Sequence, residues 1–418
     1  MVAGVKRKRG WLYRIGVVTL TLVFLLGIGS AIFHERLSRL YRVIRLFDQD
    51  VIVENFRHMD GIIGTRTVHK AIQATTFAKE PQPLPTSFTY GGKAINLQQF
   101  LKDQYTTGMI IIKDNKIAFE DYWLGNDDKS VVISWSVAKS MISALIGIAV
   151  DEEHIRSIND PVTDYVPFLK GTGYDNVPIK HVLQMSSGIG FNENYADFHS
   201  DINRLGRLLA LNTSIDEFVA SLKNIREPGT YNQYVSMDTQ VLSMVLREVT
   251  GKTIAEYMEE KLWKKIGTES DGYWLIDNKG VEIVFGCYNA VLRDYARFGL
   301  LYLNNGECNG ERVVPDVWVR ASVKPDAPHL QPGNNPLSYW VLGYGYQWWI
   351  PQNPEGDFLA VGVAGQYIYV HPAHGLVIAK SSAYGDYKKD GKDKILQTIE
   401  MFRAIVRSMA NEEKAEAA

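Results

Sequence analysis

The sequence predicts an α+β fold in which an antiparallel β-sheet, flanked by helices, is split by an inserted all-helical region. Three observations predict it: an early pair of strands, a long middle stretch with helical patterning, and a return of short strands near the end of the chain. Strands and helices that are grouped separately along a chain are typical of α+β folds, because the helices then gather beside the sheet. One N-terminal transmembrane helix is predicted to precede this fold.

Length and composition limit the functions that the chain can have. It has 418 residues, of which 46% are hydrophobic, enough for a large domain with a sizeable core. The formal net charge is −2, which gives no support for a nucleic-acid partner. Cys287 and Cys308 form neither a disulfide framework nor a metal-type spacing. Pro372 lies between His371 and His374, so we expect a turn there, with no metal and no cofactor.

The N-terminus combines a basic tail with an apolar run. Residues 6–9 are all basic, and residues 15–33 carry no charge. Since about 20 apolar residues cross a bilayer as a helix, residues 1–33 are interpreted as a cytoplasmic tail and a transmembrane anchor. A signal peptide cleaved near Gly29–Ala31 is the alternative, but the long apolar run and the basic flank after it favour the anchor. The lipid membrane is then a partner, and the positive-inside rule favours a periplasmic location for the rest of the chain.

A connector and one large domain are expected after the anchor. Residues 34–85 are interpreted as a juxtamembrane connector that ends in the proline-rich segment Glu80–Pro85. This segment is extended, because proline fixes φ and biases the preceding residue away from helix. Residues 86–418 are predicted to form the functional domain, with the helical insertion at about residues 160–265.

The elements of this domain follow from their patterning. Met109–Lys113 and Lys116–Trp123 read as two strands joined by a tight turn at Asp114–Asn115. Ser136–Val150 is apolar nearly all round, as in a buried central helix. Short turns separate the late strands, so that part of the sheet should be antiparallel. The late strands are expected at residues 344–350, 358–363, 366–370 and 376–381, and a closing amphipathic helix at residues 392–409.

Ser136 and Lys139 are the first residues that could carry chemistry. Positions i and i+3 share one face of a helix, so the Lys139 amine can reach the Ser136 hydroxyl. Serine needs a base to become a nucleophile, and a lysine can be that base if burial lowers its pKa. Ser-x-x-Lys occurs by chance about once in a chain of this length, but here the lysine is embedded in an apolar helix. The start of this helix also offers backbone N–H groups to a developing oxyanion.

Two further elements accompany this pair. Tyr234 and Ser236 follow the turn Glu227–Thr230, and a tyrosine near a lysine-activated serine can carry a proton to a leaving group. Gly362–Gln366 lies at a turn within the late strands, where small residues let a substrate backbone lie close. Each element alone also fits a plain structural role, as a packed tyrosine or an ordinary glycine-containing hairpin.

In this order, the three elements resemble the serine β-lactamase and penicillin-binding-protein superfamily, in particular its class C, esterase and 6-aminohexanoate-dimer hydrolase branch. The resemblance runs from about Met109 to Ser382. His181–Ile189 is similar to the family's helix followed by Ser-Gly, and Arg293–Gly299 to its Arg-Asp-x-Ala-Arg-Phe-Gly helix. Glu227–Thr230 is similar to the Pro-Gly turn before the family's tyrosine. The resemblance implies a β-lactamase/transpeptidase-like fold.

The resemblance also implies a role for each site residue. Ser136 would be the acylated nucleophile, Lys139 its base and Tyr234 the proton-transferring tyrosine. The backbone N–H groups of Ser136 and Gln366 would form the oxyanion hole. Ser236 stands where many members have asparagine. The substrate-binding residues would be Ser236, Gly362, Val363, Ala364 and Gly365.

The predicted function is hydrolysis of a small ester or linear amide through an acyl-enzyme intermediate. In the family, a lysine, histidine or arginine often begins the third motif and engages an anionic substrate carboxylate, whereas Val363 stands there in this sequence. This departure disfavours β-lactam hydrolysis and D-Ala peptidase action, which stay alternatives because Arg204 or Arg207 could supply the cation. A non-catalytic membrane-tethered binding or scaffold relative is a further alternative, but it would be expected to lose one of the three catalytic residues.

Overall fold

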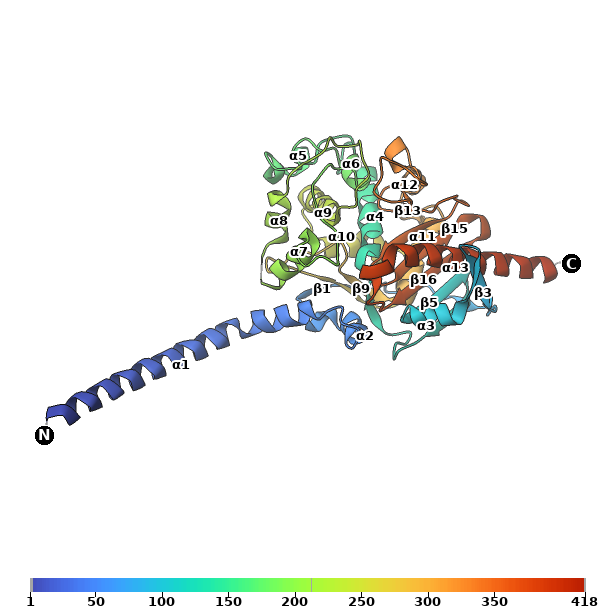
Figure 1. Cartoon of the computed structure of the whole chain (residues 1–418). Helices are drawn as coiled ribbons and strands as arrows, with labels where there is room; N and C mark the ends of the chain where they lie inside the picture. The colour runs from blue at the N-terminus through green and yellow to red at the C-terminus, as the bar shows by residue number, and fades with distance from the viewer. Residues whose placement is uncertain (1–2, 212, 417–418) are drawn as a thin grey trace.

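A computed structural model describes residues 3–211 and 213–416, and their side chains except those at 3–10, 25, 26, 28, 30–33, 35 and 411–416. It confirms the α+β class: a large sheet and a smaller one are packed with helices (Figure 1). The large sheet has the strand order β12-β13-β14-β15-β16-β5-β6-β2, and all neighbours are antiparallel except β2 and β6. Its strands are β2 (Ala78–Lys79), β5 (Thr106–Lys113), β6 (Lys116–Tyr122), β12 (Gly343–Tyr344), β13 (Trp349–Ile350), β14 (Phe358–Gly362), β15 (Gln366–His371) and β16 (Leu376–Ser382).

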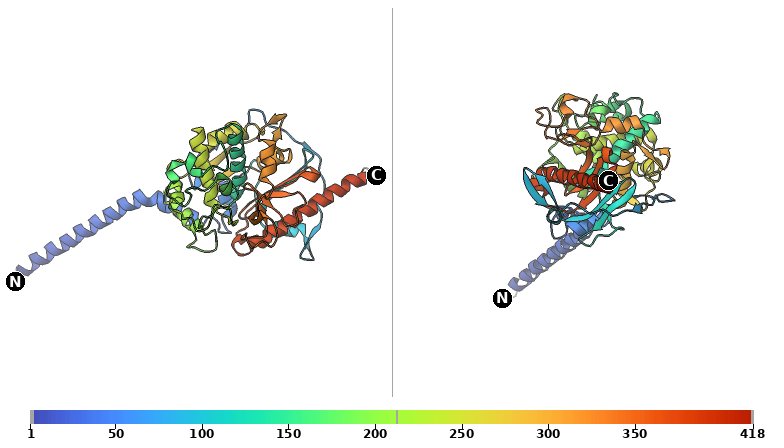
Figure 2. Two further views of the ribbon diagram at one scale, coloured as in Figure 1. Left: turned by 90° about the horizontal axis from the view of Figure 1, so that it is seen from above. Right: turned by 90° about the vertical axis from the view of Figure 1, so that its right-hand side faces the viewer.

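The two faces of the large sheet pack into different parts of the core. Ile110 of β5 belongs to one hydrophobic cluster and Met109 to the other, because successive side chains of a strand point to opposite faces. Helix α11 (Leu292–Leu303) covers the first face. Helix α13 (Tyr387–Glu416) covers the second, with Phe402 packed in that cluster (Figure 2). The sheet is therefore buried on both sides, as its apolar strands require.

A helical region lies in the chain between strands β7 (Val131–Ile133) and β8 (Gly272–Leu275), and so separates the early strands of the large sheet from its late strands. Helix α4 (Ala138–Asp151) lies between this region and the large sheet (Figure 1). Its residues from Ala138 to Ala149 are buried, and it packs against α9 and α12 (Asp316–Ser322). The helical region contains α5 (Val162–Tyr165), η3 (Pro167–Leu169), α6 (Ile179–Leu183), α7 (Asp201–Ala210), α8 (Ile215–Ser221), α9 (Ser236–Thr250), α10 (Ile254–Met258) and η4 (Glu259–Trp263).

The segment 34–85 is more than the connector that the sequence suggests. Helix α2 (Ile52–Arg57) buries Ile52 and Phe56 in the hydrophobic cluster that also contains Ile110. Strand β1 (Thr65–Val68) is an edge strand of a four-stranded antiparallel sheet with the order β1-β8-β9-β7. The other strands of this sheet are β7 (Val131–Ile133), β8 (Gly272–Leu275) and β9 (Tyr288–Val291). The N-terminal segment is thus part of the packed domain.

Short elements complete the domain around its edges. The hairpin of β3 and β4 lies beside α3 and α13. The short elements are η1 (Met59–Gly61), β3 (Ser87–Tyr90), β4 (Lys93–Asn96), α3 (Leu97–Asp103), η2 (Trp135–Val137), β10 (Glu307–Cys308), β11 (Glu311–Arg312), η5 (Pro328–Leu330) and η6 (Pro372–His374).

Helix α1 (Ala3–Ile44) extends away from the domain (Figure 1). Within the described part of the chain, no helix is long and apolar enough to cross a membrane, so the predicted transmembrane helix is not found. The apolar stretch 15–33 includes side chains outside the described residues, at 25, 26, 28 and 30–33. From residue 15 onward, the side chains are described without a gap only as far as Phe24, whereas a bilayer crossing needs about 20 apolar residues. The periplasmic location stays a prediction.

Gly147 marks the point at which α4 meets α12, and it generates a stability prediction. A Cβ at Gly147 would lie 2.4 Å from the indole of Trp318. We expect Gly147→Ala to lower the free energy of unfolding by about 1–3 kcal/mol, the usual cost of overpacking a core. Urea unfolding followed by tryptophan fluorescence measures this change.

The matched control for that prediction is Gly206→Ala in α7. No atom lies within 4 Å of the position that its Cβ would take, and alanine is the better helix former by roughly 1 kcal/mol. We expect this variant to be at least as stable as the parent. Unchanged stability of Gly147→Ala would contradict the packing of α4 on α12.

Candidate active site

Ser136 lies in the short turn of η2, between strand β7 and helix α4. The residue before it, Trp135, has a φ of 43°, in the left-handed region that non-glycine residues rarely adopt. Its indole stacks on Phe47 at a centroid distance of 4.9 Å and meets the edge of Phe56 at 5.4 Å. The N-terminal segment therefore holds the backbone turn that presents the Ser136 side chain.

Lys139, at the start of the adjoining helix α4 and one turn after Ser136, contacts the Ser136 hydroxyl directly. Its Nζ donates a hydrogen bond to Ser136 Oγ at 2.9 Å and another to the backbone oxygen of Phe285. The side chain is almost completely buried, with 1% exposed. Burial lowers the pKa of Lys139 to about 7, because apolar surroundings disfavour the charged ammonium. The amine is therefore available as a proton acceptor near neutral pH.

Tyr234 completes a cluster with Ser136 and Lys139. The Lys139 Nζ lies 5.0 Å from the centroid of the Tyr234 ring, and that ring stacks on Trp349 at 5.4 Å. Burial raises the pKa of Tyr234 well above its usual value, more than the hydrogen bond with Ser136 lowers it. The phenol is therefore protonated at neutral pH and can donate its proton.

The turn between β14 and β15 lies beside this cluster. A Cβ on Gly362 would lie 2.5 Å from the backbone oxygen of Ser134, so only glycine lets the strand approach the start of η2 this closely. Ala364 and Gly365 both have positive φ, at 58° and 91°. The side chain of Gln366 donates to the backbone oxygen of Ser382 at 2.6 Å and so points toward β16. The oxyanion-hole role of its backbone N–H stays a prediction.

Ser236, predicted to bind substrate, lies at the start of α9. Its side chain is fully buried, and its hydroxyl has no hydrogen-bond partner among the described residues. Ser236 is absent from the described residues that line the two cavities beside Ser136. The structure therefore does not bring Ser236 to the cavity surface with the other predicted substrate-binding residues.

Glu193 is a charged residue of the site that the sequence did not single out. Its Oε1 accepts the backbone N–H of Ser236 at 2.6 Å, while its buried Oε2 has no hydrogen-bond partner among the described residues. Burial raises the pKa of Glu193, and its charge in turn raises the pKa of Lys139. Glu193 stands in no motif and only the fold brings it here, so no sequence signal could have identified it.

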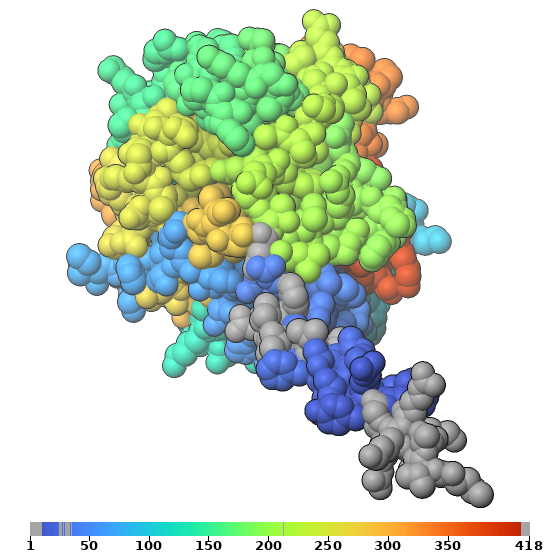
Figure 3. Space-filling view, turned by 90° about the vertical axis from the view of Figure 1, so that its left-hand side faces the viewer, coloured from blue at the N-terminus to red at the C-terminus, as the bar shows by residue number. Residues whose placement is uncertain are grey.

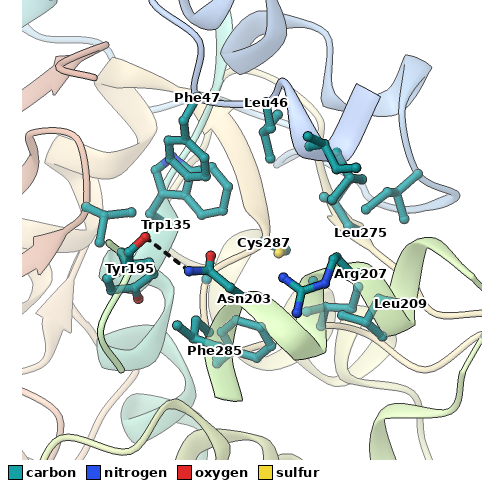
Figure 4. A pocket seen from close by; sticks show the side chains of 18 of the residues that line it. Leu46, Phe47, Trp135, Tyr195, Asn203, Arg207, Leu209, Leu275, Phe285 and Cys287 are labelled. Carbon is teal, nitrogen blue, oxygen red and sulfur yellow. Dashed lines mark hydrogen bonds between the residues drawn. The ribbon is translucent and has the colours of Figure 1, made fainter. Parts of the chain in front are cut away.

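Two cavities meet at Ser136. The first, of about 310 Å³, lies between the N-terminal segment and α7 and is called the N-terminal cavity (Figure 4). The second, of about 210 Å³, is walled by aromatic rings, among them Tyr339, Trp340 and Trp349, and is called the aromatic cavity. Ser136 and Val363 line both. A carbonyl group at Ser136 can therefore have one substrate arm in each cavity.

Comparisons with known proteins agree with this arrangement. The family model described as Beta-lactamase matches residues 96–398. A 6-aminohexanoate-dimer hydrolase of Paenarthrobacter ureafaciens is 30% identical over 341 residues, which cover 79% of this chain and 85% of that protein. A teichoic acid D-alanine hydrolase of Staphylococcus aureus is 21% identical over 253 residues, which cover 58% of this chain and 57% of that protein.

Solved structures show the same fold. A Bacillus anthracis protein assigned to the 6-aminohexanoate-dimer hydrolases superposes with a TM-score of 0.78 at 24% identity, over 88% of this chain and 96% of that one. A family VIII carboxylesterase superposes with a TM-score of 0.53 at 17% identity, over 74% of this chain and 97% of that one.

The lowered pKa of Lys139 predicts how the reactivity of Ser136 depends on pH. The neutral amine is the form that can activate the serine in the predicted mechanism, and it is lost to protonation as the pH falls below about 7. We expect the rate of labelling by a fluorophosphonate probe to fall roughly tenfold per pH unit below that point and to level off above it. Labelling reactions that are stopped at set times, followed by mass spectrometry of the peptide that contains Ser136, measure this profile.

Glu193→Gln should move that profile to lower pH. Removing the carboxylate removes a charge that favours the ammonium form of Lys139, so the amine stays neutral to a lower pH. Glu248→Gln is the matched control, because it removes the same charge from an exposed position on α9. A profile that stays in place or moves to higher pH in Glu193→Gln would contradict the electrostatic link.

Proposed function

The chain belongs to the beta-lactamase family of serine hydrolases, and we propose that it cleaves ester or linear amide bonds through an acyl-enzyme intermediate on Ser136. The observation that carries the proposal is the 2.9 Å hydrogen bond between Lys139 Nζ and Ser136 Oγ. A serine and a lysine in direct contact, with the lysine buried, form a nucleophile with its base.

Acylation uses the cluster in the following way. The neutral amine of Lys139 accepts the proton of Ser136 as Oγ attacks the substrate carbonyl carbon. The carbonyl oxygen becomes an oxyanion, held by the backbone N–H groups of Ser136 and Gln366. Tyr234 donates its proton to the leaving oxygen or nitrogen, the bond to the carbonyl carbon breaks, and the Lys139 ammonium returns a proton to the phenolate. General acid–base steps of this kind typically contribute about 10²- to 10⁴-fold to the rate.

Deacylation reverses the proton transfers with water in place of the leaving group. The water loses a proton to the pair of Lys139 and Tyr234 as its oxygen attacks the acyl carbon. The ester bond to Ser136 Oγ then breaks, Oγ recovers a proton, and the carboxylic acid product departs. Neither half-reaction needs a cation at the third motif, because Lys139 and Tyr234 carry the protons.

The residue at the third motif supports esters and linear amides as substrates. Val363 lines both cavities and offers neither charge nor hydrogen-bond donor to a carboxylate next to the scissile bond. A carboxylate buried there would lose its hydration without compensation. The names of the relatives, a 6-aminohexanoate-dimer hydrolase and a teichoic acid D-alanine hydrolase, also favour substrates other than β-lactams. β-Lactam hydrolysis and D-Ala peptidase action are the less favoured candidates.

The substrate class has a direct test. We expect a higher kcat/KM for p-nitrophenyl butyrate than for nitrocefin on the same preparation, because only nitrocefin presents a carboxylate to Val363. Ser136→Ala is the control, and it should abolish the turnover of both. Faster hydrolysis of nitrocefin that depends on Ser136 would overturn the proposed substrate class in favour of a β-lactamase.

A further inference from the structure

The N-terminal cavity has an unusual distribution of charge. Its wall is mainly apolar, with Leu46, Phe47, Leu209 and Leu275 among the residues that line it. Among its described lining residues, the charged side chains are Arg207 of α7 and Lys388 of α13, and none is acidic. The cavity therefore combines an apolar wall with positive charge and begins at Ser136.

Arg207 is available to a ligand. Its guanidinium is half-buried and lies flat against Phe198, with Cζ 3.9 Å from the ring centroid. Within the described part of the chain, the Arg207 guanidinium forms no ion pair and no hydrogen bond. A guanidinium that is partly removed from water without an anion is unfavourable, whereas one that faces an anionic ligand forms strong, bidentate hydrogen bonds.

The position of Arg207 sets the distance at which an anion is held. Figure 4 shows Arg207 across the cavity from Trp135, which directly precedes Ser136, with Asn203 and Cys287 between them. The cavity is bounded by the N-terminal segment and α7, which lie against each other on the face shown in Figure 3. Asn203 of α7 also donates to the backbone oxygen of Tyr195 at 3.0 Å and so holds the neighbouring loop. An anion at Arg207 therefore lies across the cavity from the reacting carbonyl, and the mainly apolar wall suits an apolar chain that joins the two.

The place of Tyr234 decides which half of the substrate enters this cavity. Tyr234 lines the aromatic cavity and is absent from the described lining of the N-terminal cavity. In the proposed function it protonates the leaving group, so the leaving group departs on the side of the aromatic cavity. The acyl half must then occupy the N-terminal cavity.

We propose that the N-terminal cavity binds an acyl group made of an apolar chain that ends in a carboxylate, and that Arg207 receives this carboxylate. The proposal rests on the proposed function, because it assigns the acyl half of the same acyl-enzyme. Lys388 adds positive charge at the rim, where its Nζ lies 5.6 Å from the centroid of the Phe47 ring. A chain that ends in an ammonium group would meet two cations and be repelled.

The test compares three p-nitrophenyl esters with chains of similar length. They are the mono-ester of adipic acid, which ends in a carboxylate, the hexanoate, which ends in a methyl group, and the 6-aminohexanoate, which ends in an ammonium. We expect kcat/KM of the parent enzyme to be highest for the adipate and lowest for the 6-aminohexanoate. The preference for the adipate should weaken as salt is added, because the charges are partly exposed.

Variants of Arg207 test its part in this preference. Arg207→Gln should reduce the ratio of kcat/KM for adipate over hexanoate by about tenfold, the loss of a charge-assisted hydrogen bond. Arg207→Lys should restore part of the ratio, and Arg207→Glu should favour the 6-aminohexanoate. The matched control is Arg204→Gln, because Arg204 stands on the same helix over Phe218 and outside the described cavity lining. It should leave the ratio unchanged.

The outcomes separate this proposal from the proposed function. If the hexanoate is hydrolysed in a Ser136-dependent way without preference for the adipate, the cavity proposal is wrong and the hydrolase assignment stands. A preference that survives in Arg207→Gln but disappears in Lys388→Met would contradict the assignment to Arg207. If none of the three esters is hydrolysed, either by the parent enzyme or by Ser136→Ala, the proposed function is contradicted instead.

Discussion

The burial of one lysine amine is the constraint on which the rest of the site depends. Lys139 is 1% exposed, and its amine can be so deeply buried at neutral pH only because burial also makes the neutral form favourable. That burial requires cover on every side of α4. The helical region provides it on one side through α9, α12 covers another, and η2 joins the helix to the sheets. The division of the large sheet by a helical insertion thus creates the buried environment that lowers the pKa of Lys139.

The polar and charged groups around Ser136 differ between the two sides of the site. Glu193 and Tyr234 lie on the side of the aromatic cavity, where the proposed mechanism has Tyr234 protonate the leaving group. Arg207 and Lys388 lie on the side of the N-terminal cavity, where positive charge suits an anionic acyl arm. The N-terminal segment builds this second side, since Phe47 both stacks on Trp135 and lines the cavity. The segment before the family domain therefore contacts the turn that holds Ser136 and also forms part of the cavity wall.

The sequence predicted those parts of the site that depend on local spacing. Ser136 and Lys139 are three residues apart, and helical geometry alone brings them together. The early hairpin was predictable because Asp114 and Asn115 tolerate the positive φ that they adopt, at 49° and 61°. Glu193 was not predictable, because it meets Ser236 and Lys139 only through tertiary packing. Ser236 was placed by resemblance, which does not reveal that its side chain is fully buried. The role of residues 34–85 was missed because β1 pairs with β8, about 200 residues further along the chain.

The most direct test of the central claim is the pKa of Lys139 itself. Lysine labelled with ¹³C at Cε reports the protonation of each amine by NMR, and the signal absent from Lys139→Met identifies Lys139. The buried Lys380, whose pKa burial also lowers to about 7, is assigned in the same way from Lys380→Met. We expect the Lys139 signal to titrate near pH 7. Titration near the ordinary value of about 10.4 would show that Lys139 is charged at neutral pH and would contradict its role as the base.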